Sequence, residues 1–127
     1  MDKKDELLLA LRPIITGIDL DSSTSEDELF QNKTLRPVIK AQHKLLVASF
    51  IEYLGQHKIN MDQLGEKEKK GIIDNTYSKN KTFRSYNLGL IAGFLTQEEL
   101  GYYLLNKSSI SKRIIQMIKQ RIDDTLG

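Results

Sequence analysis

Two polar stretches of the chain contain the side chains best suited to bind an anion. The predicted site residues are Gln31, Asn32, Thr34, Arg36 and Lys40 in the first stretch, and Asn106, Ser108, Ser109, Lys112 and Arg113 in the second. Each stretch is predicted to begin a helix, with Thr34 as one N-cap and Ser108 or Ser109 as the other. Free amides at helix starts and cationic side chains both attract anions, so the two stretches could together bind a carboxylate or a phosphate. The alternative is that these cations are an ordinary solvated helix face.

The same two stretches resemble the signature of a family of small all-helical bacterial proteins of unknown function. Phe30 to Pro37 reads FQNKTLRP, and Asn106 to Arg113 reads NKSSISKR. The resemblance covers most of the chain from about Phe30 onward. It implies a helical fold in which the two stretches share a site, and it implies no established mechanism. Some members of the family carry the label glyoxalase.

The chain lacks the motifs of the common enzyme classes. His43 and His57 are the only histidines, and neither belongs to an HExxH or ExxH pair that could hold a metal. Neither a GxSxG nucleophile elbow nor a GxxxxGK[ST] phosphate loop is present. A metal-dependent glyoxalase needs a mostly β scaffold with His and Glu ligands, so we discount that label. We therefore expect no enzyme activity, no catalytic residue, no metal and no cofactor.

Nucleic acid is an alternative partner for two basic segments. Residues 77–86 interleave Lys79, Lys81 and Arg84 with three aromatic residues, a composition suited to phosphate contacts and base stacking. Residues 96–113 loosely resemble a helix-turn-helix that would present Lys112 and Arg113. Against this alternative, the turn lacks the usual glycine, and the aromatic side chains could equally face the core.

Composition and charge predict a single domain of ordinary globular type. The chain has 127 residues, no cysteine and a net charge of +2, which is compatible with the cytoplasm of a bacterium. Residues 1–30 sum to −5 and residues 31–127 to +7, so an acidic leader over residues 1–28 either lies against a basic body or stays solvated. We expect Asp19–Asp27 to be a partly mobile loop. Neither a signal peptide nor an apolar run of the roughly 18 residues that a membrane span needs is evident.

Apolar residues recur at helical spacing and predict an all-α bundle of five or six helices with a long central helix, Gln31–Leu54. This helix begins either at Thr34 or near Ser25 with a kink at Pro37, and Gly55 is expected to end it. Asn60 or Asp62 would cap the next helix, and Thr82 would begin the one after it. Thr96 with Glu99 predicts a capping box.

The final helix contains an isoleucine every fourth residue. Ile110, Ile114, Ile118 and Ile122 form a stripe that serves either as core or as the seam of a homodimer. The favoured function is a non-catalytic protein-interaction or regulatory module whose partner is another protein or a second copy. Nucleic-acid binding and binding of a small anion at the paired helix starts remain the alternatives.

Overall fold

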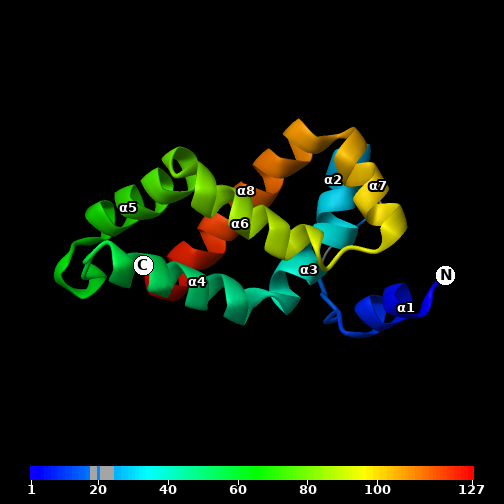
Figure 1. Ribbon diagram of the computed structural model, residues 1–127, viewed down its shortest axis with the longest axis horizontal. Coiled ribbons are helices and arrows are strands. Elements are labelled where there is room, and N and C mark those ends of the chain that lie inside the picture. The colour runs from blue at the N-terminus through cyan, green and yellow to red at the C-terminus, as the bar shows by residue number, and fades with distance from the viewer. Residues whose placement is uncertain (18–19, 21–24) are drawn as a thin grey trace.

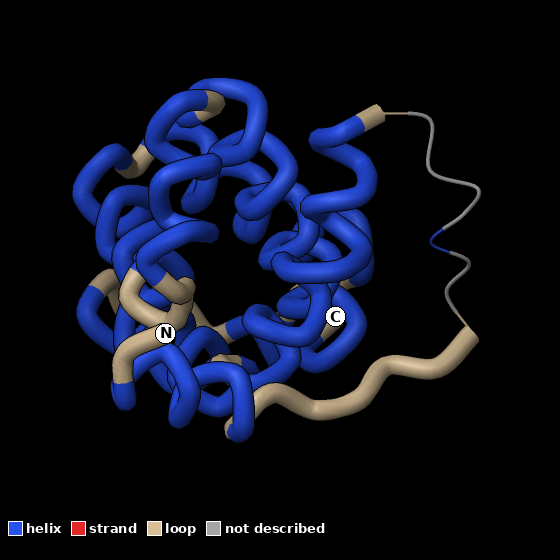
Figure 2. Tube along the Cα trace, turned by 90° about the vertical axis from the view of Figure 1, so that its right-hand side faces the viewer, coloured by secondary structure: helices blue, strands red, loops and turns tan. Residues whose placement is uncertain are grey.

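The protein folds as an all-α bundle, which confirms the predicted fold class (Figure 1). The computed structural model describes residues 1–17, 20 and 25–127. The helical segments, in chain order, are α1 (Lys3–Ala10), α2 (Glu26–Phe30), η2 (Gln31–Leu35), α3 (Arg36–Ala41), α4 (His43–Gln56), η3 (Met61–Gln63), α5 (Glu66–Lys79), α6 (Lys81–Ala92), α7 (Gln97–Leu105) and α8 (Lys107–Leu126). Figure 2 shows a long loop after α1 and mostly short connections between the later helices, with no strand among the residues that are described.

The predicted central helix is present but divided, so the expectation of one uninterrupted helix over Gln31–Leu54 is wrong. Helical structure starts one turn earlier, where the Ser25 hydroxyl caps α2 by accepting from the Glu28 amide at 3.0 Å. It then passes through η2, a π-helical segment, into α3 and α4. Gln42 separates α3 from α4, and its side-chain amide donates to the Leu90 carbonyl of α6 at 2.9 Å. The earlier start near Ser25 is thus the correct alternative.

The π-helical turn of η2 lies immediately before Pro37. The Arg36 amide donates to the Gln31 carbonyl, five residues back rather than four. A proline in a regular helix lacks an N–H and its ring collides with the carbonyl four residues earlier. The wider turn relieves that collision without ending the helix. Thr34, predicted as an N-cap, is instead buried within this segment.

Helix α8 runs through the middle of the bundle and contacts α4, α5, α6, α7 and η2 (Figure 1). The four isoleucines of its predicted stripe, Ile110, Ile114, Ile118 and Ile122, are all fully buried. Full burial within one chain explains the stripe as core, so it is not the seam of a homodimer.

Several predicted helix ends move by a few residues. The Thr96 capping box is confirmed, with both reciprocal hydrogen bonds to Glu99. Asn60 caps only the short 3-10 turn η3, and α6 begins at Lys81 behind an Asn80 cap rather than at Thr82. Gly55 lies inside α4, and the left-handed residue after this helix is Lys58, with φ of 55°.

The N-terminal helix α1 contributes no buried residue to the core. It lies below the start of α7 at one end of the bundle (Figure 1). The predicted mobile loop Asp19–Asp27 falls largely outside the described residues, except that Ser25, Glu26 and Asp27 form the cap and first turn of α2. None of the described helices combines the length and the apolar composition needed to cross a bilayer.

Candidate functional site

A cleft of about 1290 Å³ lies along α8, with η2 and α3 opposite. Eight of the ten predicted site residues line it: Gln31, Arg36, Lys40, Asn106, Ser108, Ser109, Lys112 and Arg113. The two polar stretches, more than 60 residues apart in the sequence, therefore meet at one place. That they bind a ligand there remains a prediction.

The cleft is strongly basic. Six cationic side chains line it: Arg36, Lys40, Lys107, Lys112, Arg113 and Arg121. The only carboxylate among its described lining residues is Asp124. Within the described part of the chain, the ion pairs are Arg12–Glu99 and Lys119–Asp74, so none of the six cations is neutralised by one. Like charges gathered in a cleft focus the electric field and raise the local concentration of anions.

One direct hydrogen bond joins the two walls of the cleft. The Arg113 guanidinium of α8 donates to the Gln31 side-chain carbonyl of η2 at 2.8 Å. Arg36 lies on the same wall as Gln31, and its Nε donates to Asn32 Oδ1 at 2.8 Å, one turn earlier. Both guanidinium groups thus bond to neutral amides, so each keeps its full charge and further N–H donors for a ligand.

Asp27 of α2 bonds to Ser109, one of the residues that line the cleft. Its carboxylate accepts from the Tyr102 hydroxyl at 2.5 Å and from the Ser109 hydroxyl at 2.9 Å, which ties α2 to α7 and α8. These two hydrogen bonds, with the charge of Arg113, lower the pKa of Asp27 below its ordinary value. The hydrogen bond to the carboxylate in turn raises the pKa of Tyr102 to about 12. Asp27 is therefore ionised, and Ser109 serves this junction instead of capping a helix.

The predicted mechanism of paired helix starts is wrong in part. Helix α8 does begin at the cleft, but at Lys107 and with no side-chain cap from Ser108 or Ser109. The other stretch lies inside a continuous helical path, where the Arg36 amide is already bonded to the Gln31 carbonyl. Asn32 and Thr34 do not line the cleft. Charged and amide side chains, rather than backbone amides from two helix ends, define this site.

Sequence reasoning missed several residues of the cleft. The missed cations are Lys107 and Arg121, and the missed amides are Gln116 and Gln120. Arg113, Met117 and Arg121 follow one another at four-residue spacing, so they share a face of α8. That periodicity was the available signal for extending the site along the helix beyond Arg113.

The residues predicted to contact nucleic acid lie in different places. Lys79 and Lys81 line a second cleft beside Tyr53 and Asn75, whereas Lys112 and Arg113 line the basic cleft on α8. The Arg84 guanidinium donates to the Tyr77 carbonyl at 3.4 Å. Tyr77 is fully buried, and its ring stacks on Phe50 with centroids 5.8 Å apart. Tyr77 therefore cannot stack on a base. Asn106 alone joins α7 and α8, whereas a helix-turn-helix has a turn of about three or four residues.

The histidines have structural contacts. Arg121 lies 3.3 Å from His43 Nδ1, and the His57 ring stacks on Tyr53 with centroids 4.1 Å apart. In the part of the chain that the structure describes, no group of three or more acidic, histidine or cysteine side chains is arranged to hold a metal ion.

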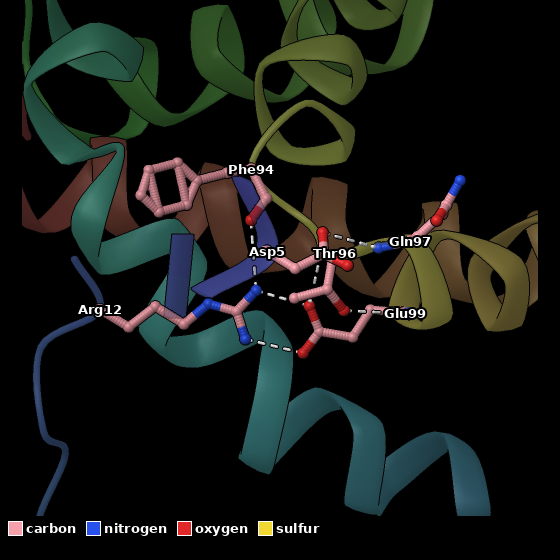
Figure 3. Close-up of polar contacts among 6 residues, drawn as sticks. All are labelled: Asp5, Arg12, Phe94, Thr96, Gln97 and Glu99. Carbon is pink, nitrogen blue, oxygen red and sulfur yellow. Dashed lines mark hydrogen bonds and ion pairs between the residues drawn. The ribbon is translucent and has the colours of Figure 1, made fainter. Parts of the chain in front are cut away.

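A clasp fixes the N-terminal segment to the start of α7 (Figure 3). Arg12 donates to both carboxylate oxygens of Glu99, at 2.7 Å and 2.5 Å, and to the Phe94 carbonyl at 3.2 Å. Burial raises the pKa of Glu99, but the hydrogen bonds from Arg12 and Thr96 outweigh it, so the pKa lies below its ordinary value. The clasp also fixes the chain three residues before Ile15, which lines the basic cleft.

Comparison of the chain with protein-family models, with curated proteins and with solved structures finds no match. The resemblance to a bacterial helical family therefore stays a prediction from the two polar stretches, and the geometry of the basic cleft has to support any functional conclusion.

Proposed function

We propose that this chain is a non-catalytic binding module that holds an anionic part of its partner in the basic cleft along α8. The observation that supports this function is the set of six cations on one cleft, none of them in an ion pair within the described residues. Gathering like charges costs free energy through mutual repulsion. An anionic partner removes that cost, so the repulsion among the cations favours occupation of the cleft by an anion.

The cleft is better equipped for binding than for chemistry. A general acid or base has to stand beside a site where a reacting group can be placed, and the described lining holds only one carboxylate, Asp124. That carboxylate is exposed and accepts a hydrogen bond from Gln120 at 2.8 Å. Arg113 and Arg121, by contrast, are half-buried and are held by side chains that are not carboxylates, Gln31 and His43, which suits stable charge recognition.

Tripolyphosphate is a simple anionic probe of this proposal. We would follow backbone amide resonances of the isotope-labelled protein by NMR during a titration at low salt. The expected result is saturable shifts grouped around Arg36, Lys40 and Lys112, which weaken as salt is added. Shifts spread evenly over the surface, or absent from the cleft, would refute the proposal.

A pair of charge-matched variants supplies the control. Lys40→Gln with Lys112→Gln removes two exposed cations from the cleft, whereas Lys67→Gln with Lys70→Gln removes two exposed cations from α5. Both double variants lower the net charge equally and alter no buried side chain. Only the cleft variant should lose affinity, by roughly tenfold if each cation contributes about 0.7 kcal/mol. Equal losses in both would mean that net charge alone attracts the probe.

A further inference from the structure

The dimensions of the basic cleft favour a long ligand. Pockets for small molecules have volumes of about 300–1,000 Å³, and this cleft is larger, at about 1290 Å³. Its lining extends along α8 from Lys107 to Thr125, which corresponds to roughly 27 Å of helix at 1.5 Å per residue. A segment of a polymer fits such a length better than an isolated phosphate or carboxylate does.

The apolar part of the lining argues against nucleic acid. Ile15, Ile39, Leu105 and Met117 line the cleft together with the cations, and no aromatic ring is found among its described lining residues. Strand-binding proteins stack bases on aromatic side chains, which this cleft does not offer. Aliphatic and thioether side chains instead provide adaptable contacts for apolar side chains of a polypeptide.

The neutral polar residues also match a polypeptide. Gln31, Asn106, Gln116 and Gln120 line the cleft, and each side-chain amide can both donate and accept hydrogen bonds. Phosphate groups offer only acceptors, so a phosphate polymer would supply no donor to the side-chain oxygens of Asn106, Gln116 and Gln120. A peptide backbone supplies N–H donors as well as carbonyl acceptors and can satisfy both kinds of group.

We infer that the partner is an acidic polypeptide segment with interspersed apolar residues, which lies along α8 in the basic cleft. Its carboxylates pair with the cations of the two walls, and its apolar side chains contact the exposed Leu105 and the half-buried Met117. A length of roughly 27 Å corresponds to about 18 residues of helix or about eight residues of extended chain. This inference rests on the proposed function, because it assumes that the basic cleft is a binding site.

Three fluorescein-labelled probes of equal net charge test the inference by fluorescence anisotropy. The first is a helical peptide of about 18 residues with glutamates on one face and leucines at positions i, i+3 and i+4 of the other. The second replaces every leucine with serine, and the third is an oligothymidylate. We expect the leucine peptide to bind at least about tenfold more tightly than either other probe, since burial of its leucine side chains adds affinity that the other probes lack.

The cleft double variant Lys40→Gln with Lys112→Gln distinguishes failure of the inferred partner from failure of the proposed function. If the oligothymidylate or the serine peptide binds as tightly as the leucine peptide, and the double variant weakens that binding, the cleft is an anion site but the inferred partner is wrong. If none of the probes loses affinity in the double variant, the proposed function itself fails. Preferential binding of the leucine peptide that the double variant weakens supports both.

Discussion

The Arg12–Glu99 clasp allows a quantitative prediction about the N-terminal segment. Only 9% of the Arg12 side chain and 18% of the Glu99 side chain are exposed, so water screens this ion pair weakly. Arg12→Met keeps an unbranched apolar stem but removes three hydrogen bonds at once. Removing one partner of a buried ion pair costs about 3–5 kcal/mol, because the other charge is left without compensation.

The lower end of that range applies to this clasp. Glu99 keeps its hydrogen bond from the Thr96 amide at 2.8 Å, and α1 has no buried residue that would resist detachment and hydration. We therefore expect Arg12→Met to lower the free energy of unfolding by about 3 kcal/mol. With an unfolding entropy of about 2.1 cal/mol/K per residue, this loss lowers the melting temperature by about 11 °C.

Urea denaturation followed by circular dichroism measures the effect, within a double-mutant cycle. Glu99→Gln preserves the shape of the side chain, and the double variant should show about 2 kcal/mol of coupling between the two positions. Leu7→Ala is the control in α1, where a side chain that is 55% exposed should change stability by no more than about 0.5 kcal/mol. A loss below about 1 kcal/mol for Arg12→Met would refute the role given to the clasp.

Three further predictions concern single features of the fold. Tyr77→Phe should leave stability unchanged or raise it slightly in urea denaturation, because the buried hydroxyl has no hydrogen-bond partner among the described residues; a loss above about 1 kcal/mol would contradict this. Lys58→Gly should raise the free energy of unfolding by about 0.5–1 kcal/mol, because glycine adopts the φ of 55° without strain; a lower melting temperature would reveal a contact that lysine provides. Asp27 and Glu99 have pKa values that are lowered in the folded state. Their contributions to the free energy of unfolding should therefore be complete above the ordinary pKa values of 3.8 and 4.5, and should disappear as the pH falls through the lowered pKa values. Unfolding measured from about pH 7 to about pH 3 checks this, and a Glu99→Gln variant with an unchanged acid slope would contradict it.

The candidate site was only partly predictable from the sequence. Gln31, Arg36, Lys112 and Arg113 could be selected because polar and cationic side chains at predicted helix starts favour an anion. Their meeting in one cleft depends on how α8 packs against η2, which no local pattern encodes. Arg121 was missed as a site residue: its spacing places it on the same face of α8 as Arg113, but packing decides which face of that helix stays open.

By itself, the sequence determined the helical class, the Thr96 cap and the isoleucine stripe of α8, because local hydrogen bonding and helical periodicity act over a few residues. Only the tertiary structure decided where the central helical path divides. At Gln42 the division accompanies a hydrogen bond to Leu90, 48 residues away along the chain. Tertiary packing likewise decided that the stripe is core, because burial depends on what other helices cover. The basic cleft also depends on tertiary packing. Its cations can be read from the sequence, but its walls form only when segments distant in the chain pack together.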